Sequence, residues 1–197
     1  MPPLRGDGNL VEALEKKVRE AWAAGVGYVQ LREKDLSGRA LACLTEALRA
    51  ARGPHTESAL LVNERLDVAA SCGADGVHLP ADSLPAAAVR RAAGSGWTVG
   101  LSCHSEAEVE RAVQDGCSYV LLSPIFPTPS KPGVAPLGLE ALARVCRRCS
   151  VPVFALGGVD AANAASCVQA GAAGVAGIRL FQQAADLAAL CRYLHSL

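Results

Sequence analysis

The chain has 197 residues, 51% of them apolar, which is enough to fill one core, so we expect a single domain over residues 1–197. Lysine plus arginine equals aspartate plus glutamate, and this formal net charge of zero argues against nucleic acid or an anionic membrane as a partner. No apolar run is long enough to cross a membrane, and the start of the chain lacks a signal peptide's apolar core, so we expect a cytoplasmic protein.

The first predicted element is a helix over about residues 9–24, followed by an apolar run. This pattern, in which a helix ends in small residues and a glycine precedes a short apolar run, occurs four times. Glycine suits the left-handed position after a helix, and the runs fit strands that are buried on both faces. The four copies cover residues 21–31, 69–79, 112–122 and 167–178.

Three more apolar runs lie between these copies, at residues 59–63, 98–102 and 152–156. Strict alternation of strands and helices predicts an α/β fold with a parallel sheet. Seven such strands favour a (β/α)8 barrel of the TIM type. A doubly wound open sheet is the alternative, which the absence of a G-x-G-x-x-G pattern weakens.

An eighth strand would have to precede the first helix, where MPPLRGDG contains no strand-like run. We therefore expect the first strand to be missing from this chain. Either the start of the chain is truncated or misassigned, or the barrel itself is incomplete.

Eight cysteines occur at irregular spacing, several of them within apolar patterns. We expect them to be reduced and mostly buried. Cys146 and Cys149 form a C-x-x-C pattern without a second pair, which indicates a helix turn rather than a metal or redox site.

In β/α barrels the active site lies at the carboxyl ends of the strands, and the loops after the last two strands usually bind phosphate. Glycines there let the backbone approach a ligand, and the helices that follow offer free N–H groups. An arginine in the last loop adds a charge. We predict a phosphate site at Gly157, Gly158, Gly177, Ile178 and Arg179, with a tight turn as the alternative interpretation.

A second group of residues at predicted strand ends is cationic. Arg32 and Lys34 alternate along one strand end and therefore point the same way, and Lys131 follows a later strand. Three cations on one rim of a neutral protein indicate an anionic substrate, unless they are solvated or paired with neighbouring carboxylates. Gln30 and Asn63 can add neutral hydrogen bonds.

His104 is the best-placed acid–base group, because it follows the strand at residues 98–102 and histidine titrates near neutral pH. Cys103 beside it should point elsewhere, since adjacent residues at a strand end usually face apart. His78, at another strand end, is either a site residue or a hydrogen-bonded structural residue.

Seven segments in this order resemble the thiamin phosphate synthase and TenI family, over about residues 10–181: VQLREKDL, LVNERLDVA, GVHLPADSLP, GLSCHS, SPIFPTPSKPG, ALGGVDAAN and GAAGVAGI. The resemblance implies a (β/α)8 barrel. It also implies a synthase that joins a pyrimidine diphosphate to a thiazole phosphate and releases pyrophosphate, or a relative of that enzyme.

The resemblance carries over residue by residue. The positions that match the pyrimidine diphosphate pocket are Gln30, Arg32, Lys34, Asn63, Ser102, Thr128, Ser130 and Lys131. The positions that match the thiazole phosphate site are Gly158, Ile178 and Arg179, although the family commonly has serine where Arg179 stands.

The synthase needs magnesium, which two carboxylates hold in the patterns N-D and H-x-G-Q-x-D. Here the first pattern reads Asn63-Glu64, and Ser83 stands in place of the second aspartate. The TenI branch, which includes a thiazole tautomerase, does not need this metal, and a histidine matching His104 is its expected acid–base residue. We therefore expect a TenI-like tautomerase, an isomerase without metal or other cofactor, acting on a small phosphorylated thiazole.

Two alternatives stay open. A thiamin phosphate synthase would use Glu64 and Asp82 for magnesium, and a catalytically silent relative would bind the ligand without turnover. Homo-oligomerisation is compatible with each of the three.

Overall fold

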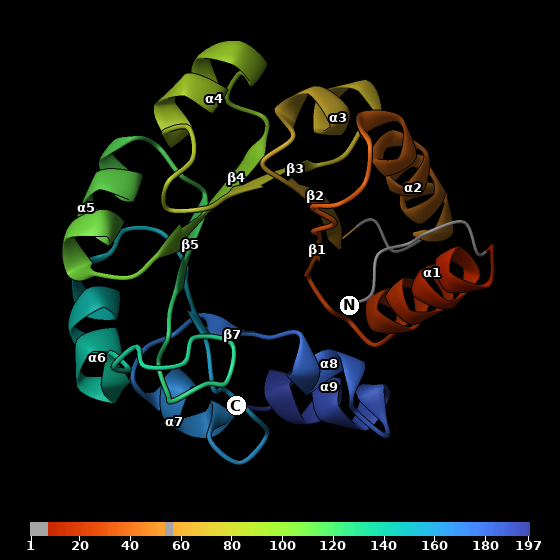
Figure 1. The fold of residues 1–197 in the computed structure, drawn as a ribbon. Coiled ribbons are helices and arrows are strands. Elements are labelled where there is room, and N and C mark those ends of the chain that lie inside the picture. The colour runs from red at the N-terminus through yellow and green to blue at the C-terminus, as the bar shows by residue number, and fades with distance from the viewer. Residues whose placement is uncertain (1–7, 54–56) are drawn as a thin grey trace.

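The computed structural model describes residues 8–53 and 57–197. Figure 1 shows a curled sheet with helices along its outer face. The strands are β1 (Tyr28–Leu31), β2 (Ala59–Asn63), β3 (Gly76–Leu79), β4 (Thr98–Cys103), β5 (Tyr119–Leu122), β6 (Val153–Leu156) and β7 (Gly174–Ala176). The helices are α1 (Gly8–Ala23), α2 (Gly38–Ala51), α3 (Leu66–Ser71), α4 (Ala86–Ala93), α5 (Glu106–Gln114), α6 (Gly138–Arg148), α7 (Ala164–Gln169), α8 (Arg179–Gln182) and α9 (Leu187–His195).

The sheet is parallel throughout, and its seven strands follow one another in chain order from β1 to β7. The predicted α/β barrel class, its seven strands and the first helix are confirmed. Within the described residues no pairing joins β7 to β1, while α1 packs against α9 on the outside. The prediction about a missing first strand falls on residues 1–7, outside the described residues, and the single domain stays a prediction.

The main core lies between the outer face of the sheet and the helices. Alternate strand residues face outward, as Val62, Val77 and Val99 do, and they pack in one buried cluster with helix residues such as Leu48 and Leu142. Because strand side chains alternate between faces, the residues between them line the inside of the curled sheet. The side chains that are available for a functional site therefore lie on the inner face of the sheet and at its edge.

The eight cysteines all lie in the described part of the chain, where they are free, and five of them are buried. Burial raises the pKa of Cys103 to about 12 and that of Cys117 to about 11, so these thiols stay protonated. Cys146 lies in the last turn of α6 and Cys149 directly follows this helix, as predicted for a helix turn. None of the described helices is both long enough and apolar enough to span a membrane.

Candidate functional site

The predicted site residues collect at the carboxyl edge of the sheet. Because the strands are parallel, the segments that follow them all emerge at this edge. Ser102 lies near the end of β4, and His104 comes just after that strand. Thr128, Ser130 and Lys131 lie in the long segment between β5 and α6, which we call the β5–α6 loop (residues 123–137).

His104 holds the side chain of Lys131. The His104 ring atom Nδ1 lies 2.8 Å from the backbone oxygen of Ser123, and a carbonyl oxygen only accepts, so Nδ1 carries a proton. Lys131 Nζ lies 3.1 Å from Nε2 and 3.3 Å from Nδ1, so the ammonium group rests against the imidazole ring. The backbone N–H of His104 donates to Glu108 Oε2 at 2.7 Å. The imidazole is thus a fixed support for the lysine.

The cations predicted at this edge have no ion-pair partner within the described part of the chain. Arg32 and Lys34 follow β1 and are exposed, and Lys131 is half-buried. None of the three makes an ion pair within 4.0 Å with another residue of the described ranges. Their positive charge is therefore available to an anionic ligand. The role of Gln30, which is partly buried in β1, stays a prediction.

Gly157 and Gly158 have a structural reason to be glycines. Their φ angles are +89° and +67°, a region that side chains disfavour. A Cβ on Gly157 would lie 2.8 Å from Pro124 Cα, and one on Gly158 would lie 2.5 Å from the Pro127 oxygen. The Phe126 N–H also donates to the Gly157 oxygen at 3.0 Å. The glycines therefore make room for the β5–α6 loop, and their phosphate-binding role stays a prediction.

Arg179 brings the two predicted sub-sites next to each other. It is the first residue of α8, and its Nη2 donates to Thr128 Oγ1 at 3.4 Å. Thr128 belongs to the predicted diphosphate pocket and also accepts from the Ser130 N–H at 3.4 Å. Gly177 and the exposed Ile178 come directly before Arg179. The β5–α6 loop thus runs from His104, after β4, to Arg179, after β7.

His78 lies inside the curled sheet rather than on its surface, with an exposed fraction of 2%. Its Nδ1 is 2.9 Å from the Tyr119 hydroxyl, and its Nε2 is 2.8 Å from Ser102 Oγ. Burial, with a smaller contribution from the charge of Arg32, lowers the pKa of His78 to about 4. His78 is therefore neutral at physiological pH. Sequence reasoning missed its partner Tyr119.

Two carboxylates at this edge could hold a metal ion. Glu64 and Asp82 are exposed and follow the neighbouring strands β2 and β3. Glu64 has a φ of +60°, and Asn63 Nδ2 donates to its Oε2 at 3.1 Å. Such a conformation costs about 1–3 kcal/mol and clusters at functional sites. No three His, Cys, Asp or Glu residues of the described ranges form a metal-binding group, but Mg²⁺ commonly takes one or two carboxylates and completes its shell with substrate phosphates.

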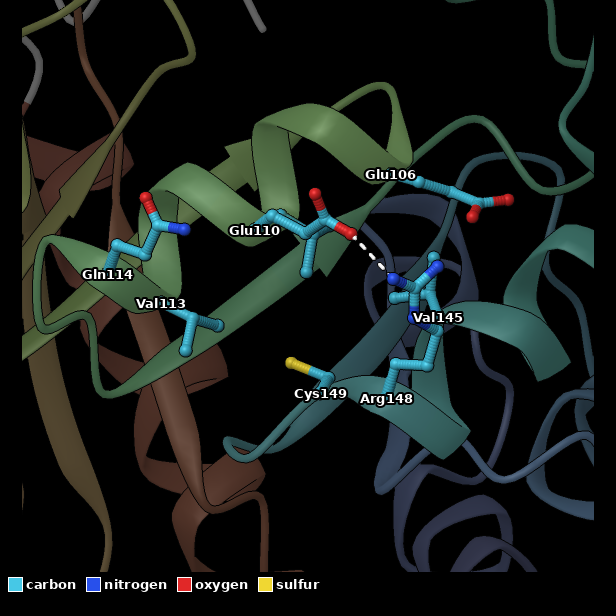
Figure 2. A pocket seen from close by; sticks show the side chains of 8 residues that line it. Glu106, Glu110, Val113, Gln114, Val145, Arg148 and Cys149 are labelled. Atoms are coloured by element: carbon cyan, nitrogen blue, oxygen red, sulfur yellow. Dashed lines mark ion pairs between the residues drawn. The ribbon is translucent and has the colours of Figure 1, made fainter.

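A separate groove of about 210 Å³ lies between α5 and α6, on the outside of the barrel. Figure 2 shows Val113, Val145 and Cys149 lining it, with the ion pair of Glu110 and Arg148 (3.2 Å) across it. The groove contains none of the predicted site residues. The carboxyl edge of the sheet, rather than this groove, is therefore the candidate site.

The chain is similar to proteins of one family over most of its length. The family model described as thiamine monophosphate synthase matches residues 5–181. A thiamine-phosphate synthase of Roseiflexus sp. is 42% identical, covering 93% of this chain and 78% of the relative. That of Methanoculleus marisnigri is 42% identical, covering 89% and 83%. The solved thiamine phosphate pyrophosphorylase of Pyrococcus furiosus superposes with a TM-score of 0.83 at 27% identity, covering 95% of this chain and 90% of that one.

These relatives correct the expected activity. The sequence favoured a TenI-like tautomerase, an isomerase, mainly because Ser83 replaces a carboxylate. This expectation is wrong, because relatives at 42% identity are named thiamine-phosphate synthase, which is a transferase. By sequence and by fold, the chain belongs to the thiamine monophosphate synthase family.

Proposed function

We propose that this protein is a thiamine-phosphate synthase, which joins a pyrimidine diphosphate to a thiazole phosphate and releases pyrophosphate. The observation that carries the proposal is the set of cations at the carboxyl edge that make no ion pair within the described residues, with Lys131 held against His104. Such a set of positive charges suits a diphosphate substrate, which carries several negative charges. The names of the relatives point to the same reaction.

The cations would stabilise the leaving group. In the proposed reaction the bond between the pyrimidine substrate's carbon and the diphosphate oxygen breaks, and this oxygen keeps the electron pair while the thiazole forms the new bond. Negative charge grows on the pyrophosphate, and positioned cations stabilise such charge. Lys131, Arg32 and Lys34 are assigned to this task, with the loop residues Thr128 and Ser130 beside Lys131.

The second substrate's phosphate would bind on the other side of Thr128. Arg179 reaches Thr128 from the start of α8, so a phosphate held by Arg179 and the backbone around Gly177 would lie next to the diphosphate pocket. This arrangement suits a reaction that joins two phosphorylated molecules. Asn63 and Gln30, at the ends of β2 and β1, would make neutral hydrogen bonds to the substrates.

Magnesium belongs to this proposal. Glu64 and Asp82 would hold the ion together with diphosphate oxygens, because both carboxylates are exposed at the ends of adjacent strands. Bound there, the ion would neutralise charge on the pyrophosphate. The left-handed conformation of Glu64 supports this assignment, since the surrounding structure has to maintain it.

The test is release of pyrophosphate by the full chain, measured with a coupled assay. We expect release only when the pyrimidine diphosphate, the thiazole phosphate and Mg²⁺ are all present, and loss of release with EDTA. Glu64→Gln should raise the Mg²⁺ concentration needed for half-maximal rate about tenfold or more, since even the loss of a residue that only orients a metal ligand costs about 10- to 100-fold in metal affinity. No release under any condition would contradict the proposal.

A further inference from the structure

A chain of hydrogen bonds crosses the inside of the sheet and ends at the candidate site. It joins Tyr119 on β5, His78 on β3 and Ser102 on β4 through contacts of 2.9 and 2.8 Å. Gly100 pairs with both His78 and Tyr119 in the register of the sheet, and a side chain on it would collide with the Tyr119 ring. This missing side chain lets His78 reach Tyr119 across β4.

The Tyr119 hydroxyl determines which ring nitrogen of His78 carries the proton. Tyr119 is 3% exposed, and aromatic rings surround it: Tyr28 is stacked on it at 5.1 Å, and Phe154 meets it edge-on at 5.6 Å. Its hydroxyl makes one hydrogen bond to the described residues, and the partner is His78 Nδ1. If Nδ1 carried the proton, the phenol hydrogen would have no acceptor, and leaving a buried donor unsatisfied costs about 1–3 kcal/mol. Nδ1 therefore accepts.

The proton of the neutral His78 ring then lies on Nε2, which donates to Ser102 Oγ. The Ser102 hydroxyl hydrogen cannot point back at a nitrogen that already carries a proton. Ser102 is partly exposed, and its hydroxyl makes no second hydrogen bond within the part of the chain that the structure describes. Its hydrogen is therefore free to be donated to a ligand.

We propose that Tyr119 and His78 are positioning residues that fix Ser102 as a hydrogen-bond donor at the carboxyl edge. The ligand atom opposite Ser102 is then an acceptor, either an unprotonated ring nitrogen or an oxygen, and an amino group is rejected there. If the proposed function holds, the ring nitrogens of the pyrimidine substrate are acceptors of this kind. The specificity thus originates from a buried tyrosine that does not touch the ligand.

The tautomer of His78 can be measured on the ligand-free protein, independently of any activity. ¹⁵N NMR of the histidine ring nitrogens distinguishes a protonated from an unprotonated nitrogen. We expect His78 to carry its proton on Nε2 in the wild-type protein. Tyr119→Phe should allow both tautomers, whereas the matched control Tyr28→Phe, which keeps the ring stacked on Tyr119, should leave the tautomer unchanged. A proton on Nδ1, or a tautomer unaffected by Tyr119→Phe, overturns the proposal.

Kinetics tests the consequence at Ser102 and rests on the proposed function. Tyr119→Phe should raise KM for the pyrimidine diphosphate about fivefold with little change in KM for the thiazole phosphate, which corresponds to about 1 kcal/mol for one neutral hydrogen bond. A purely structural role would instead change both KM values, or neither. Absence of all activity would refute the proposed function, while the NMR result would still decide the tautomer.

Substrate analogues identify the acceptor. Two analogues of the pyrimidine diphosphate are needed, each with one ring nitrogen replaced by C–H, and their affinities are compared in the wild type and in Ser102→Ala. We expect one analogue to bind about fivefold more weakly to the wild type, as loss of about 1 kcal/mol predicts, and the difference to vanish in Ser102→Ala. Equal losses in both proteins would overturn the assignment of Ser102 as the donor.

Discussion

The side chain of Lys131 is ordered before a ligand binds. A lysine side chain has four flexible bonds, and holding it in one position costs conformational entropy before a ligand arrives. The His104 ring lies against the ammonium group, with Nε2 at 3.1 Å and Nδ1 at 3.3 Å from Nζ, and the Ser123 oxygen holds the ring in place. The ammonium group is therefore already in place at the carboxyl edge when the substrate binds.

Replacing Lys131 by methionine should lower kcat about 10²- to 10³-fold, the usual effect of removing one positioned donor to a developing negative charge. His104→Ala should have a smaller effect, about tenfold, because the lysine remains but is less ordered. Steady-state kinetics checks both values, with Lys16→Met on α1 as a control far from the edge. A full rate in Lys131→Met would refute its assigned role.

His78 should make stability depend on pH. Its pKa is about 4 in the folded chain and 6.5 in the unfolded chain, so the unfolded state binds more protons between these values. Stability is fully present above pH 6.5 and is lost as the pH falls towards 4. Between pH 7 and 5 the loss should be about 2 kcal/mol. Urea unfolding checks this, and the same loss in His78→Gln would show that another group is responsible.

The β5–α6 loop is the element that assembles the site. It leaves β5, crosses the end of β6 over Gly157 and Gly158, and carries Lys131 to His104 and Thr128 to Arg179. The loop has no helix or strand of its own, so its position depends on these contacts. The two glycines therefore affect the site indirectly, because they leave the space that the loop occupies.

Gly158→Ala should displace this loop. The added Cβ would lie 2.5 Å from the Pro127 oxygen at a residue with a φ of +67°, so we expect a loss of stability of about 1–3 kcal/mol and a loss of activity. Gly94→Ala is the matched control, because its φ is +83° but no atom of the described residues lies within 4 Å of its Cβ position. It should lose stability alone. Equal activity in the two variants would contradict the role of the loop.

At the scale of elements, the sequence predicted the strands well and the contacts between them poorly. Apolar runs bounded by glycine are a local signal, and the run at residues 59–63 coincides with β2 (Ala59–Asn63). The pairing of Tyr119 with His78 depends instead on the register of β3, β4 and β5 at Gly100, which no local pattern states. Likewise, no local pattern in the sequence shows that Gly158 lies against the β5–α6 loop.

At the scale of the whole molecule, a parallel sheet brings residues that are distant in the sequence to one edge. Arg32, Lys131 and Arg179 follow β1, β5 and β7, and the curl of the sheet in Figure 1 turns the ends of its strands towards one another. The replacement at Ser83 and the residues next to it are local changes, and they led to the expectation of a tautomerase, which the relatives contradict. The relatives match the chain over almost its whole length and identify its family.

The most direct test of the proposed synthase is to identify the product. The full chain is incubated with the pyrimidine diphosphate, the thiazole phosphate and Mg²⁺, and mass spectrometry follows the condensed product while pyrophosphate is measured in parallel. The account predicts thiamin phosphate and pyrophosphate in equal amounts, both reduced about 10²-fold or more in Lys131→Met. Intact substrates after incubation with folded protein, or pyrophosphate without the condensed product, would contradict it.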